Sequence, residues 1–167
     1  WSSDVCSSDL GGIFAEGFDV VILENHGIFC ASRTDLNDAY RKFEALEHSV
    51  QTEMLAGIFG NNTSCLTESQ IEGYKDLKNR KYGTLKACAP TNEEILLRQQ
   101  ICRLSKRAYD KQIFSAANGV FSARTSDGGM IITPEGADNG CLEETELVRT
   151  VGNRCEEGKL PSRLARF

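Results

Sequence analysis

An apolar stripe along residues 36–54 is the feature that most limits what this chain can fold into. Its members recur at intervals of three and four residues: Leu36, Ala39, Tyr40, Phe43, Leu46, Val50 and Met54. That spacing places them on one face of an α-helix. Because Thr34 is a residue type that caps helices, we predict a helix that begins at Asp35 and runs to about Met54.

Short apolar runs predict two strand pairs. Val20–Leu23 and Ile28–Cys30 flank the polar segment Glu24–Gly27, which predicts a strand, a turn and a second strand. Farther along, residues 120–124 and 130–133 are separated by a glycine-rich turn, which predicts a hairpin.

Two capping boxes predict further helices. Thr67 with Gln70 marks the start of a helix that we expect to end near residues 81–83. Thr91 with Glu94 marks the start of another, which reaches about residue 111. Its apolar side chains stand among alternating charges, at Ile95, Leu97, Ile101, Leu104 and Tyr109. The later segment 142–151 fits either a helix or an extended strand.

Composition narrows the class of protein. The 167 residues suffice for roughly one ordinary domain, or for two incomplete ones. A net charge of −5 argues against binding to a nucleic-acid backbone, which requires a basic face. No apolar run approaches the roughly 20 residues that a membrane span requires. The seven cysteines include no Cys-x-x-Cys pair, which favours free thiols in a reducing compartment. We therefore expect a soluble cytoplasmic protein with neither nucleic-acid nor membrane partners.

The sequence also suggests boundaries. Pro90 ends any preceding helix, so residues 86–90 are predicted to be a linker. Residues 1–10 carry Ser-Ser-Asp twice and resemble translated sequencing-adapter read-through, so we expect an artefact there and leave them out of the fold prediction. Residues 161–164 have the pattern of a helix start at which the sequence stops. We expect a fragment at both ends.

Two blocks of the chain resemble one known family, in an order unlike that of a single domain. The first block, residues 11–85, contains Val20-Val21-Ile22-Leu23-Glu24-Asn25-His26-Gly27 followed by the long predicted helix. The second block, residues 91–167, contains three motifs: Gly119-Val120-Phe121-Ser122-Ala123-Arg124, Ile132-Thr133-Pro134-Glu135-Gly136 and Glu157-Gly158-Lys159-Leu160-Pro161-Ser162. The first block resembles the C-terminal third, and the second block the N-terminal third, of a domain of the class II aldolase/adducin family. These are the zinc-dependent sugar-phosphate aldolases related to fuculose-phosphate aldolase.

The resemblance implies an α/β fold, in which a central, mainly antiparallel sheet is flanked by helices. It also implies a tandem protein, so that the chain holds the end of one aldolase-like copy and the start of a second. The family's reaction is the retro-aldol cleavage of a small sugar phosphate to an aldehyde and a dihydroxyacetone phosphate-type product, with zinc as a Lewis acid. Because family sites lie between subunits, a homo-oligomer is implied.

His26 is the metal ligand that the resemblance assigns. In the family, the histidine of Asn-His-Gly is one of three imidazoles on zinc, and its partners form a His-x-His pair that has no match in this sequence. The residues alone favour a hydrogen-bonded turn histidine, whereas the resemblance favours a ligand in the parent protein. His48, in the predicted long helix, is expected at a surface or between helices.

The second copy is predicted to be degenerate. Leu164 stands where the family has its acid/base glutamate, so no catalytic residue is assigned. Val120 replaces an asparagine of the phosphate pocket, and Glu135 replaces a small hydroxyl residue. A carboxylate at that position would repel a phosphate dianion.

Other residues of the phosphate pocket match the family. Gly119 and Gly136 allow close backbone approach, and Ser162 can donate a hydrogen bond at a helix start. Arg163 could supply a compensating positive charge. A purely structural interpretation stays open beside this one, since the glycines could serve turn geometry and Ser162 could cap its helix.

Two functions from different classes follow. The first is a zinc-dependent aldehyde-lyase in the parent protein, with the fragment alone inactive and weak in zinc binding. The second is a non-enzymatic assembly module like the adducin head, which Leu164, Val120 and Glu135 favour and His26 opposes. A sugar-phosphate epimerase or a dehydratase of the same fold would use much the same zinc site.

Overall fold

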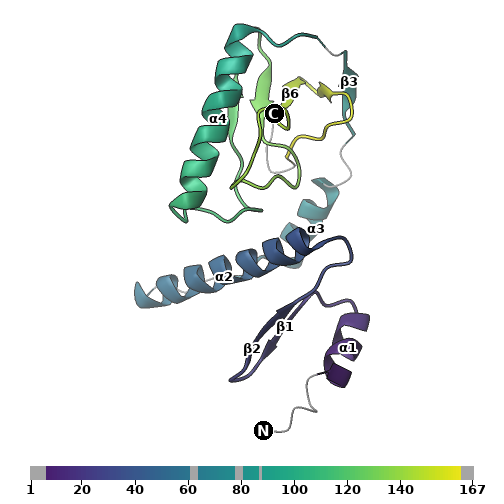
Figure 1. The fold of residues 1–167 in the computed structure, drawn as a ribbon, viewed down its shortest axis with the longest axis vertical. Helices are drawn as coiled ribbons and strands as arrows, with labels where there is room; N and C mark the ends of the chain where they lie inside the picture. The colour runs from purple at the N-terminus through teal and green to yellow at the C-terminus, as the bar shows by residue number, and fades with distance from the viewer. Residues whose placement is uncertain (1–6, 61–63, 78–80, 87, 163–167) are drawn as a thin grey trace. The chain divides into compact units, whose positions relative to one another are not determined.

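Figure 1 shows the fold as a computed structural model, which describes residues 7–60, 64–77, 81–86 and 88–162. Contacts within the chain divide it into two compact units, Trp1–Leu55 and Ala56–Phe167. Among the described residues, no helix is both long and apolar enough to cross a bilayer.

The first unit contains a β-hairpin. Strand β1 (Val20–Leu23) pairs antiparallel with β2 (Gly27–Cys30), which confirms the predicted strand, turn and strand. Helix α1 (Ser7–Ala15) precedes the hairpin and contacts β1. The sequence pattern does not predict this helix, because residues 1–10 have no helical period and were set aside.

Helix α2 (Leu36–Ile58) carries the apolar stripe and confirms the long helix. Its cap differs from the prediction, because the Asp38 backbone N–H donates to Asp35 Oδ1 at 2.8 Å. The Thr34 hydroxyl lies instead 2.8 Å from that of Ser32. The assignment of Thr34 as the cap was therefore wrong, since the carboxylate one residue later takes that role.

A lysine joins α2 to the hairpin. Lys42 Nζ lies 2.9 Å from Asp19 Oδ2, just before β1, and 2.9 Å from Asp38 Oδ2 within the helix. One cation thus bridges the segment before the hairpin and the first half of α2, in which Ala39 is buried.

Helix α3 (Glu68–Leu77) confirms the first capping box. The Thr67 N–H donates to Gln70 Oε1 at 2.9 Å, and the Gln70 N–H donates to Thr67 Oγ1 at 3.3 Å. Gly83, expected near the end of this helix, instead opens strand β3 (Gly83–Leu85). That expectation was wrong because β3 pairs with a strand far along the chain, a partner that local signals do not reveal.

The second unit contains a five-stranded sheet in the order β3-β7-β6-β5-β4. Its other strands are β4 (Ser122–Arg124), β5 (Met130–Ile132), β6 (Val148–Val151) and β7 (Arg154–Glu156). The β3–β7 pair is parallel and the other three pairs are antiparallel. The predicted hairpin at 120–133 is confirmed as β4 and β5, and the ambiguous segment 142–151 ends in a strand.

Helix α4 (Asn92–Asp110) packs along this sheet (Figure 1). It is capped as predicted by Thr91, whose Oγ1 accepts the Glu94 N–H at 3.2 Å. Ile101 packs with Ile131 and with the segment before β6, and a second cluster of Ile132, Val148 and Cys155 adds to the core.

The architecture is therefore α/β with a mainly antiparallel sheet in the second unit. Strand β3 lies before the predicted linker at 86–90 and pairs with β7 beyond it. That the two blocks are partial copies of one domain stays a prediction.

Candidate functional site

His26 lies in the loop Glu24–His26, which joins the paired ends of β1 and β2. Its backbone N–H donates to the Leu23 carbonyl at 3.1 Å. Asn25 adopts φ +57°, a left-handed conformation that asparagine tolerates better than most residues. This tight turn leaves the His26 side chain exposed at the tip of the hairpin.

The described residues do not fit a zinc site by themselves. Structural and catalytic zinc sites use three or four protein ligands. Within the part of the chain that the structure describes, no group of three His, Cys, Asp or Glu side chains is placed to hold a metal. His48, the other imidazole, is half-buried on α2. The role of His26 as a metal ligand stays a prediction that requires further ligands.

The structure brings the loops of the predicted phosphate pocket to one end of the five-stranded sheet. Gly119 precedes β4, Gly136 follows β5 and Ser162 follows β7. The Thr133 N–H donates to the Phe121 carbonyl at 3.0 Å, and the Ser162 N–H donates to the Thr133 carbonyl at 3.0 Å. Thr133 thus links segments that are far apart in the sequence.

Gly119 is required by its own surroundings. Its φ is +105°, and a Cβ built there would lie 2.8 Å from the ring of Phe114. That ring packs against Phe121, with their centroids 5.5 Å apart. A side chain at this position would strain the backbone and displace the aromatic pair, so the glycine is explained without a ligand.

Gly136 has a different environment. Its φ is +69°, and no atom lies within 4 Å of a Cβ built there. The loop is fastened by Glu135, whose N–H donates to the Leu160 carbonyl at 2.9 Å. Residues 134–137 and 158–160 line a cavity of about 410 Å³. The second predicted residue of the phosphate pocket thus borders an open space.

The charges around this cavity oppose a phosphate dianion. Glu135, Glu146 and Lys159 line it. Lys159 Nζ donates to the Leu147 carbonyl at 3.2 Å and lies 3.1 Å from Glu156 Oε2, so its positive charge is already engaged. The other two charged groups are carboxylates, which repel a phosphate.

Ser162 is buried and marks the limit of the described site. Arg163 and Leu164 lie outside the described residues. The compensating charge at the first and the missing acid at the second therefore stay predictions.

Arg98 is a structural residue near the cavity that sequence reasoning missed. It is 8% exposed, and its guanidinium donates to the Leu147 carbonyl and, at 3.0 Å, to the Glu144 carbonyl. Its Nη2 donates to Glu156 Oε1 at 2.9 Å. Arg98 therefore fastens the segment that carries Glu146 to α4.

The face of α4 that packs on the sheet includes charged residues. Its buried residues are Glu94, Arg98, Ile101, Ser105 and Ala108. By contrast, the apolar Ile95 and Leu104 are 37% and 45% exposed. The buried residues recur at intervals of four and three, which is the period of one helix face. Because two of them are charged, the apolar pattern of the sequence does not identify this face.

A second ion-pair group ties the start of α4 to the β4–β5 turn. Arg149 Nε lies 2.6 Å from Glu94 Oε1, and the same guanidinium contacts Asp127. Hydrogen bonds from the Thr125 hydroxyl and the Gly129 N–H hold the pKa of Asp127 below its usual value. These contacts order the hairpin at the sheet end opposite to the loops of the predicted phosphate pocket.

The cysteines that the structure describes are free thiols. Cys155 is buried in the core beside Ile132 and Val148. Burial raises its pKa, with a smaller contribution from the Glu156 carboxylate. Its thiol is therefore protonated at neutral pH.

Comparisons with known proteins give a partial likeness. No family model and no curated protein matches the chain. Two solved structures match in part: YgbL of Escherichia coli, at 24% identity and TM-score 0.39, and YgbL of Klebsiella pneumoniae, at 23% and 0.40. Each is described as a proposed aldolase/epimerase/decarboxylase.

The matches cover 41% and 43% of this chain but 34% and 35% of the two YgbL chains. The matched part thus spans about a third of the length of either relative. At these TM-scores the likeness carries no argument about fold or function.

Proposed function

We propose that this chain is part of a class II aldolase-like protein that cleaves a small sugar phosphate to an aldehyde and a dihydroxyacetone phosphate-type product. The observation that supports this most is the convergence of the Gly119, Gly136 and Ser162 loops at one end of the sheet, joined through Thr133. Loops gathered at one edge of a rigid sheet are a common place for binding residues.

We propose different roles for the two units. The first presents His26, which is exposed at the tip of a short turn and so is accessible to a metal completed by ligands from elsewhere in the protein. The second is a degenerate copy, because its cavity carries the carboxylates of Glu135 and Glu146. The protein would act in the cytoplasm as a homo-oligomer.

A second candidate is a non-enzymatic assembly module like the adducin head. It is favoured by one observation: Lys159, the cation of the cavity, is engaged with Glu156 and the Leu147 carbonyl. Because Lys159 is already paired within the protein, it would add little electrostatic attraction for a phosphate ligand.

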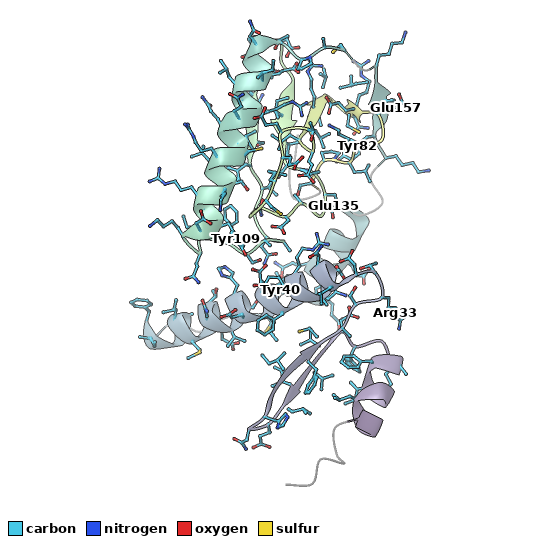
Figure 2. All side chains as sticks on the ribbon, in the orientation of Figure 1. Arg33, Tyr40, Tyr82, Tyr109, Glu135 and Glu157 are labelled. Carbon is cyan, nitrogen blue, oxygen red and sulfur yellow. The ribbon has the colours of Figure 1, made fainter. Side chains whose placement is uncertain are left out.

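The test of the phosphate-loop assignment uses the single substitution Glu135→Ser. It removes a repelling carboxylate and adds a hydroxyl donor, so we expect affinity for a ketose phosphate to rise by about tenfold or more, measured by calorimetry. Glu157→Ser is the matched control, because that exposed glutamate lies on the neighbouring loop and does not line the cavity (Figure 2). Equal affinity in both variants would contradict the assignment.

The test of the lyase uses the whole protein supplied with zinc. We expect aldehyde release from a panel of ketose phosphates, and its loss in His26→Ala. Release that survives this substitution would refute the role of His26. Absence of release in the whole zinc-supplied protein would favour the assembly module.

A further inference from the structure

A separate cavity of about 570 Å³ lies between the C-terminal half of α4 and the loop at residues 140–142. Its volume is in the range of small-molecule sites, about 300–1,000 Å³. Gly140 lets the loop approach the helix closely, because a Cβ at that position would lie 2.8 Å from the Tyr109 ring. Figure 2 shows Tyr109 near the end of α4. The cavity is thus formed within the second unit.

A row of cations lines the helix side of this cavity. Arg103, Arg107 and Lys111 follow one another at intervals of four residues, which places them along one side of α4. Lys106 and Asp110 also line the cavity, and they pair with each other at 2.9 Å, so their charges offset. Among the described residues, the three cations of the row have no side-chain partner.

General composition does not explain this row, since the chain as a whole carries a net charge of −5. Like charges four residues apart repel one another and destabilise a helix. The negative end of the helix dipole compensates cations in the last turn, which accounts for Arg107 and Lys111 but not for Arg103, a turn earlier. An uncompensated cation row beside a cavity is the expected form of an anion site.

Besides its charged residues, the cavity is lined by uncharged ones, Cys102 on α4 and residues 140–142 of the loop. Leu142 is buried, and Cys102 is half-buried with its pKa raised, mostly by burial and then by the Glu144 carboxylate. Burial raises the pKa of Cys141, and the Asp138 and Glu146 carboxylates raise it further, but neither carboxylate lines the cavity. An organic group could therefore lie against the thiols and Leu142.

We propose that this cavity binds a small organic polyanion, with its anionic groups on Arg103, Arg107 and Lys111 and its carbon skeleton against Cys102 and Leu142. The row spans about 12 Å along the helix axis, from eight residues at 1.5 Å each. One phosphate is shorter than this row. The site thus suits an elongated ligand with anionic groups at both ends, such as a bisphosphate ester or a tricarboxylate.

The experiment measures protection of the cavity thiols. Mass spectrometry follows the alkylation of Cys102 and Cys141 by a neutral maleimide, with exposed Cys88 as the internal reference. The probes are a hexose bisphosphate, citrate and inorganic phosphate. We expect saturable protection by the bisphosphate or by citrate, at concentrations at least about tenfold lower than inorganic phosphate requires. Which of the two protects better identifies phosphoryl or carboxylate groups as the preferred anion.

Variants decide where the ligand binds. The double substitution Arg103→Gln with Arg107→Gln should raise the protecting concentration by about tenfold or more, because two charge-assisted contacts are lost. Arg124→Gln, which removes an exposed arginine of β4 outside the cavity, should leave it unchanged. The double variant is expected to fold, since it relieves repulsion.

Two results would overturn the proposal. One is the absence of saturable protection up to about 10 mM probe, because a Kd above that concentration is weaker than that of most specific sites. The other is equal protection in the double variant and in Arg124→Gln, which would indicate non-specific attraction. Glu135→Ser changes the other cavity, so its outcome does not decide this one.

Discussion

Gly119→Ala tests whether the first glycine of the phosphate-pocket motif is a structural requirement. At φ +105° an alanine is strained by about 1–2 kcal/mol, as for L-residues in left-handed conformations. The new methyl group, 2.8 Å from the Phe114 ring, must also displace that ring, and such overpacking costs about 1–3 kcal/mol. We therefore expect the free energy of unfolding to fall by about 2–5 kcal/mol.

Gly136→Ala is the matched control. Its φ of +69° is also positive, at the edge of the left-handed region that L-residues occupy, and the added methyl group meets open space, so only the conformational cost of about 1–2 kcal/mol applies. Urea denaturation followed by far-ultraviolet circular dichroism measures both variants. Hydrogen exchange at Ile131 and Ile132 in the core assigns the change to the second unit.

The steric part of the argument has its own check. Phe114→Ala removes the ring that the new methyl group meets, so combining it with Gly119→Ala should cost less than the sum of the two separate changes, by about 1–3 kcal/mol. Additive losses, or equal losses for Gly119→Ala and Gly136→Ala, would refute the reasoning.

Two further predictions concern charged groups. Arg98→Met should lower the free energy of unfolding by about 2–4 kcal/mol in urea denaturation, because the Glu144 carbonyl loses its donor while the Leu147 carbonyl and Glu156 keep only Lys159. A loss below about 1 kcal/mol would contradict this. The pKa of Asp38 is lowered from 3.8 to about 2, first by the Ser32 hydroxyl and then by Lys42. Since the folded pKa lies below the unfolded one, its contribution to stability is present above about pH 4 and is lost as the pH falls towards 2. Titration by NMR should show a higher Asp38 pKa in Ser32→Ala, and an unchanged value would refute the assigned cause.

Signals that act over a few residues predicted both hairpins and helices α2, α3 and α4, but not α1. The Thr67–Gln70 capping box and the Thr91 cap both form, because their donors and acceptors lie within one turn of each other. The choice between Thr34 and Asp35 failed at the same scale, since both are capping residues and the sequence does not rank adjacent acceptors.

Interactions between distant residues were not predictable. The pairing of β3 with β7 places Thr84 opposite Cys155, and no residue near Thr84 predicts a strand partner so far along the chain. Arg98 belongs to the same class of failure. A guanidinium on an amphipathic helix is expected to face solvent, and only the fold supplies the carbonyls and the carboxylate that satisfy it.

The two glycines of the predicted phosphate pocket differ as evidence for a ligand, because their surroundings differ. Gly119 is fixed by Phe114, so its match to the family motif would arise in any chain with this aromatic packing. Gly136 borders an open cavity, where a loop that approaches a ligand would lie, yet Glu135 beside it lines the same cavity. The backbone at Gly136 therefore leaves open space, whereas the Glu135 carboxylate that lines the same cavity would repel a phosphate dianion. Glu135→Ser separates them, because it changes the charge without altering the φ of the glycine that follows.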